Sequence, residues 1–197
     1  MRTTEDLRRQ DIKELFNKVL REEKVKISPI SISIREQLEQ KHTIVDFAFE
    51  VNQSPTPTVY SFDNIRGQGF VDAIFTATHN HFIEDYDSLS NLSLLELIVK
   101  PIFSMSEKDS KSDAKTDVIV RVQNKDHGVS EFSYRSSSIV NASFRVILEM
   151  FQFYVNCDKA FRKLKFFLKD AQSRNRGDTA QEIITDLSKL TTVNTYV

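Results

Sequence analysis

Twice along this chain, three segments of alternating apolar and polar residues are followed by a segment of helical periodicity. In the first half, residues 30–34, 43–52 and 59–63 alternate with period two, which predicts strands with one buried and one solvated face. Apolar residues from Phe70 to Ile83 then recur at the spacing of one helix face. The first half therefore predicts the order strand, strand, strand, helix.

The second half repeats this order. Strands are predicted at residues 92–103, with an interruption near Pro101, and at residues 116–124 and 130–135. A long helical stripe then runs from Phe144 toward Leu168. The two halves thus repeat a βββα plan about 70 residues apart. Helices packed on the strands of both units predict an α+β fold.

A further helix with one apolar face is predicted at each end of the chain. The first carries Ile12, Leu15, Phe16 and Val19, and the second follows a capping-box pattern at Thr179 and Glu182. We expect an N-terminal helical extension at residues 1–27, a domain of two βββα units at 28–173, and a C-terminal helix and tail at 174–197. Because both terminal helices lie outside the repeated core, at least one apolar face is expected to pack on a partner chain.

The charge balance argues against electrostatic steering toward nucleic acid or acidic lipid. Lys and Arg number 27 against 28 for Asp and Glu, so the formal net charge is −1. Residues 159–169 are basic and apolar together, which is typical of an amphipathic helix on an ordinary domain and also of a membrane or RNA contact. No apolar run approaches the roughly 18 residues of a membrane span, and residues 1–10 lack a signal-peptide core. We therefore expect a soluble cytoplasmic protein without nucleic-acid or membrane partners.

Two of the only four glycines, Gly67 and Gly69, stand between the third predicted strand and the helix that follows. Glycine there allows a sharp turn, a positive φ and bare N–H groups at the positive end of the helix, where a carboxylate can bind. The pair lacks the third glycine of a dinucleotide site and the Lys-Ser/Thr of a P-loop, which argues against phosphate. A tight turn without a ligand is the alternative interpretation.

Three motifs in this order resemble a known family. Gly67-Gln68-Gly69-Phe70-Val71-Asp72-Ala73 resembles the Gly-x-Gly-Pro-Val-Asp-Ala motif that opens the first helix of the C-terminal regulatory domain of α-isopropylmalate synthase and citramalate synthase. Asp113-Ala114 with the strand that follows resembles the family's Gly-x-Asp-Ala-x-x-x-Val-x-Val segment, and residues 139–143 are similar to its Asp-Ile-Val-Glu-Ala-Ser segment. The resemblance covers roughly residues 28–156, and the family domain is itself a pair of βββα units.

The chain departs from the family pattern at three positions. Phe70 replaces the proline of the first motif, Ser112 replaces a glycine, and Ser138 replaces an acid. Phe70 adds bulk where the family's amino-acid effector lies. An alternative function is therefore a structural or interaction protein that kept the fold and lost the ligand pocket.

The resemblance implies a non-catalytic effector-binding and dimerisation domain that serves the regulation of branched-chain amino acid biosynthesis. The implied effector is leucine or isoleucine, bound near the interface of a homodimer that regulates a catalytic partner in trans. The effector-binding residues carried over are Gly67, Gln68, Gly69, Phe70, Val71, Ala73, Ala114, Thr116 and Ile139. For each apolar residue among them, an ordinary place in the core is the alternative.

No catalytic residue, metal or cofactor is predicted. The family's catalytic TIM barrel needs about 250 residues, more than this chain holds. The pair His79 and His81 falls in a helical pattern, where residues two apart point away from each other and cannot share a metal. An enzyme with an unrecognised site between the helices and the 106–115 loop is a further alternative.

Overall fold

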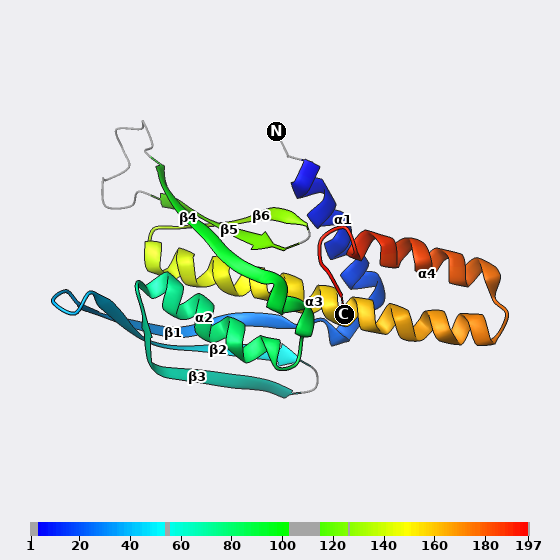
Figure 1. Ribbon diagram of the computed structural model, residues 1–197, viewed down its shortest axis with the longest axis horizontal. Coiled ribbons are helices and arrows are strands. Elements are labelled where there is room, and N and C mark those ends of the chain that lie inside the picture. Colours follow the sequence, from blue (N-terminus) through cyan, green and yellow to red (C-terminus); the bar gives the residue numbers. More distant parts are fainter. Residues whose placement is uncertain (1–3, 54–55, 103–114, 126, 197) are drawn as a thin grey trace.

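A computed structural model describes residues 4–53, 56–102, 115–125 and 127–196, with the side chains of residues 4–7 left out. The fold is α+β and contains the two predicted βββα units (Figure 1). The elements in chain order are α1 (Thr4–Val19), η1 (Arg21–Glu23), β1 (Lys26–Gln37), β2 (His42–Gln53), β3 (Thr56–Gly67), α2 (Phe70–Ile83), η2 (Asp87–Asn91), β4 (Leu92–Ile102), β5 (Lys115–Asn124), β6 (Gly128–Ser136), α3 (Ile139–Ser173) and α4 (Gly177–Leu190).

Each unit contributes one antiparallel sheet, in the order β1-β2-β3 and β4-β5-β6. Three described prolines, Pro29, Pro57 and Pro101, lie inside edge strands, where a missing N–H costs no ladder hydrogen bond. Pro29 lies at a bulge in β1. Pro101 lies within β4 and pairs with Thr116 of β5, so the interruption expected near Pro101 is wrong.

The helices α2 and α3 lie between the two sheets (Figure 1). Helix α2 packs on β2 and β3, whereas α3 packs on β5 and β6 and also on β1 of the other sheet. Their buried side chains and the inward faces of β2 and β5 form a single hydrophobic cluster. Among the described residues, no helix combines the length and the hydropathy that crossing a bilayer requires.

The apolar face of α1 belongs to the same cluster. Ile12, Leu15, Phe16 and Val19 are buried, and α1 packs on α3 and α4 of its own chain. This face is therefore covered within the chain, and the expectation that at least one terminal helix packs on a partner chain stays a prediction. The buried residues of α1 are thus part of the domain's core.

Helices α3 and α4 are joined by a tight turn. Asn175 has a φ of 56°, Arg176 N donates to Ala171 O at 2.9 Å, and Asn175 N donates to Gln172 O at 3.1 Å. These bonds form a Schellman motif, which ends a helix at a residue of left-handed conformation. Helix α4 begins at Gly177 without a side-chain cap, so the capping box expected at Thr179 is wrong.

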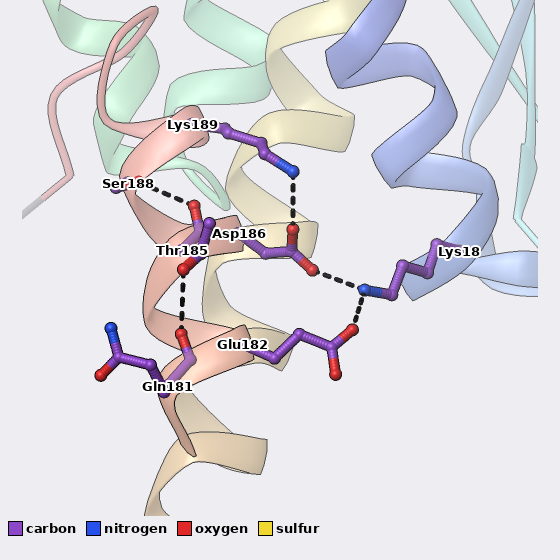
Figure 2. A network of polar contacts seen from close by, with 7 residues as sticks. All are labelled: Lys18, Gln181, Glu182, Thr185, Asp186, Ser188 and Lys189. Atoms are coloured by element: carbon purple, nitrogen blue, oxygen red, sulfur yellow. Dashed lines mark hydrogen bonds and ion pairs between the residues drawn. The ribbon is translucent and has the colours of Figure 1, made fainter. Parts of the chain in front are cut away.

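Glu182, the other half of that expected capping box, instead binds α1 (Figure 2). Lys18 Nζ lies 2.7 Å from Glu182 Oε1 and 2.8 Å from Asp186 Oδ2, and Lys189 Nζ lies 3.0 Å from Asp186 Oδ1. The side chain of Asp186 is only 7 % exposed, against 64 % for Glu182. Asp186 is therefore the more buried of the two acids that tie α4 to α1.

We predict that Asp186→Asn destabilises the fold by about 1 kcal/mol at neutral pH, a value discounted for the solvent exposure of both lysines. Glu182→Gln, which leaves the more buried contact intact, should cost less than half as much. Burial acts to raise the pKa of Asp186, but hydrogen bonds from Lys18 and Lys189 outweigh it and hold the pKa below its ordinary value.

Because the pKa is lowered on folding, this stabilisation is present above the unfolded pKa of about 3.9 and is lost as the pH falls through the folded value. The difference in unfolding free energy between wild type and Asp186→Asn should thus shrink below about pH 4. Urea unfolding across this range measures both effects. Equal losses for the two variants, or a difference that does not depend on pH, would contradict the assignment.

Candidate functional site

The turn between β3 and α2 contains the predicted glycine pair. Gly67 ends β3 and pairs with Thr43, and Gly69 is the N-cap of α2 with an extended φ of −157°. Neither glycine has a positive φ, so that expected reason for glycine is wrong here. Gly128, before β6, does adopt such a conformation at φ 81°.

The two glycines have different surroundings. A Cβ atom on Gly67 would lie 2.7 Å from Ala73 N and 2.9 Å from Ala73 Cβ, so the first turn of α2 fills this position. A Cβ atom on Gly69 would meet no heavy atom within 4 Å, apart from its chain neighbours. Close packing thus requires glycine at 67, whereas packing makes no such demand at 69.

Helix α2 begins without a side-chain cap. Ala73 N donates to Gly69 O at 3.0 Å, and Gln68 N donates to Asp72 Oδ2 at 3.1 Å. Within the described part of the chain, the N–H groups of Phe70 and Val71 have no hydrogen-bond acceptor. Two donors at the positive end of a helix are therefore available to an anion, while the Asp72 carboxylate already holds the N–H of Gln68.

The second unit makes the same junction with different residues. Residues 136–142, SSSIVNA, occupy the place of residues 67–73, GQGFVDA, between the last strand and its helix. Ser138 Oγ accepts from Asn141 N at 3.2 Å, and Ser136 Oγ accepts from Ser138 N at 3.2 Å. The start of α3 is thus capped by its own serines, and the start of α2 is not.

The remaining predicted effector residues form one group at the start of α2 in the first unit and a second group in β5 and α3 of the second unit. Phe70 and Val71 are half-buried and pack on the core, and Ala73 is fully buried, so in this conformation Ala73 faces the core rather than a ligand. Thr116 is buried in β5 opposite Ser136, and Ile139 is 44 % exposed at the start of α3. Both helices begin at the left end of Figure 1, so the two groups lie at the same end of the molecule. Ala114, with most of the 106–115 loop, lies outside the described residues.

The two histidines of α2 have separate environments. His79 Nε2 lies 3.0 Å from Leu89 O, and its ring stacks on Phe75. The His81 ring packs on Tyr60 at 4.3 Å between centroids, and burial lowers the pKa of His81. Across the described residues, no three His, Cys, Asp or Glu side chains are grouped so that they could hold a metal ion.

No family model matches the chain, and a search of curated proteins finds no match either.

We predict that Gly67→Ala and Gly69→Ala differ in stability, although they lie two positions apart. The Gly67→Ala methyl group overlaps the backbone of Ala73 and should cost about 1–3 kcal/mol, as overpacking does. The methyl group of Gly69→Ala enters open space. Alanine is a poorer N-cap residue than glycine, but it also lowers the conformational entropy of the unfolded chain, and these two effects nearly cancel. The free energy of unfolding should therefore change by no more than about 0.5 kcal/mol. Chemical unfolding of both variants measures the difference. A cost for Gly69→Ala equal to that for Gly67→Ala would contradict this account of the turn.

Proposed function

We propose that the chain is a cytoplasmic, non-catalytic effector-binding and dimerisation domain, similar to the leucine- or isoleucine-sensing domain of α-isopropylmalate or citramalate synthase. The observation that carries the proposal is the uncapped start of α2, where the N–H groups of Phe70 and Val71 have no acceptor in the described part of the chain. It coincides with the motif that the resemblance marks as the effector site. In its biological setting the domain would act on a catalytic partner in trans.

A free amino acid fits this position chemically. Its carboxylate would accept hydrogen bonds from the two N–H groups and would be favoured by the dipole of α2. A branched alkyl side chain would lie against apolar groups at the same end of the molecule, where Val71 is half-buried and Ile139 is 44 % exposed. The negative charge of the Asp72 carboxylate, which holds the N–H of Gln68, would repel an anion there, so the ligand carboxylate would bind on the side of Gly69.

A second copy of the chain would cover an apolar strand. In the first sheet, α3 packs on β1 and α2 packs on β2 and β3, whereas in the second sheet α3 packs mainly on β5 and β6. The edge strand β4 leaves Val99 at 39 % and Leu95 at 56 % exposure. Exposed apolar side chains on an edge strand support dimerisation through β4.

One feature favours the alternative, a protein that kept the fold and lost the pocket. Asp72 binds Gln68 N, and Phe70 packs on the core, so part of the turn is satisfied by the chain itself. Ligand binding therefore decides between the two functions.

We predict that leucine or isoleucine raises the melting midpoint of the wild type, by the equivalent of about 2.7 kcal/mol at a hundredfold excess over Kd. Gly69→Asp should abolish this shift without lowering intrinsic stability. Aspartate is a favoured N-cap residue, and its carboxylate would accept from the N–H of Val71 and stand where the carboxylate of the ligand would bind. Gly69→Ala is the matched control and should keep the shift. If none of the twenty amino acids shifts the wild type, the interaction protein is the better interpretation.

We predict a homodimer at micromolar concentration that Val99→Asp converts to monomer, because a charge would replace an apolar contact at the interface. Leu38→Asp is the control, since Leu38 is 84 % exposed in the β1–β2 turn and should not affect assembly. Sedimentation velocity distinguishes the two states. A monomeric wild type, or a dimeric Val99→Asp variant, would count against dimerisation through β4.

A further inference from the structure

A groove of about 770 Å³ lies against α3, bordered by α1 and by the edge strands β1 and β6. None of the nine residues predicted to bind an effector lines it. Its volume is in the range of small-molecule sites, about 300–1,000 Å³. The groove is thus a second candidate site, separate from the β3–α2 turn.

The groove concentrates positive charge in a chain whose formal net charge is −1. Five basic side chains and one acidic side chain line it, namely Arg9, Lys13, Lys24, Lys26, Arg145 and Glu149. Lys13 and Lys26 are exposed, and within the described residues neither side chain makes a hydrogen bond or an ion pair. Arg145 is held in place, since its Nε donates to Asn141 Oδ1 at 3.0 Å and its guanidinium lies over Tyr134.

The β1 wall of the groove is closed to a peptide strand. Val25 N donates to Asn156 Oδ1 and Ile27 N donates to Gln152 Oε1, both at 2.8 Å. Pro29, the next alternate residue, has no N–H group. Because an added strand needs free N–H groups on the edge, these contacts argue against strand addition here.

The same contacts leave a donor at the groove. Gln152 uses its side-chain oxygen for Ile27, and its amide nitrogen has no acceptor among the described residues. The amide is half-buried and lines the groove. It is a neutral donor placed among the cations.

We propose that this groove binds a small polyanion that carries phosphate or carboxylate groups. Lys13, Lys26 and Arg145 supply positive charge, and the side-chain amide of Gln152 donates a directional hydrogen bond. Glu149 opposes binding as the acid of the groove.

Isothermal titration calorimetry of the full chain with pyrophosphate and with citrate, at matched ionic strength, tests the proposal. We expect saturable binding of at least one of them, weakened at least about tenfold by the double variant Lys13→Gln/Lys26→Gln and strengthened by Glu149→Gln. Lys115→Gln/Lys125→Gln removes the same charge from exposed lysines outside the groove and should leave affinity unchanged. All these positions are on the surface, and thermal unfolding verifies that each variant folds.

Comparing the two probes shows which anionic group the groove prefers. Preference for pyrophosphate identifies a phosphorylated ligand, and preference for citrate identifies a polycarboxylate. Absence of saturation with both, or equal weakening by the control pair, would overturn the proposal. Gly69→Asp should leave this binding intact, so the result is independent of the effector site at the β3–α2 turn.

Discussion

The packing of α3 between the two sheets is the contact on which the rest of the structure depends. A three-stranded sheet with one solvated face buries little on its own, and α3 gives both sheets a shared core. Its buried Asn156 donates to Val25 O at 2.9 Å and accepts from Val25 N, so it pairs with the start of β1 as a neighbouring strand would. This link fixes β1 against α3 and thereby forms one wall of the cationic groove.

Most of the strands and helices could be predicted from the periodicity of apolar residues. A strand with one solvated face has a period of two, and a helix with one buried face has a period of about 3.6. Where the sequence misled, a tertiary contact decided. Pro101 suggested an interruption, yet an edge strand tolerates it. Thr179 suggested an N-cap, yet the Schellman turn at Asn175 leads directly into α4, whose N-cap is Arg176, three residues earlier. The apolar face of α1 is covered by α3 and α4 of its own chain, and its periodicity alone does not identify these partners.

The candidate sites were predictable to different degrees. The glycine turn was located from local sequence, but the reason for Gly67 lies in the approach of Ala73, which no spacing rule reveals. Ala73 itself matched a motif and is nevertheless buried. The groove was not found at all, because its basic residues come from α1, the start of β1 and the middle of α3. Each of these segments has an ordinary composition, and only folding brings the charges together.

The internal repeat provides a control for the function of the β3–α2 turn. Ser138 shows that the same strand-to-helix junction can be made with a capping side chain, so the topology does not require a bare cap at Gly69. Close packing accounts for Gly67, but neither close packing nor a positive φ accounts for Gly69. Glycine in place of serine at an N-cap costs only a few tenths of a kcal/mol, roughly, so the fold tolerates the uncapped end. What the first unit gains in exchange is a pair of free donors at a helix terminus, where a carboxylate can bind.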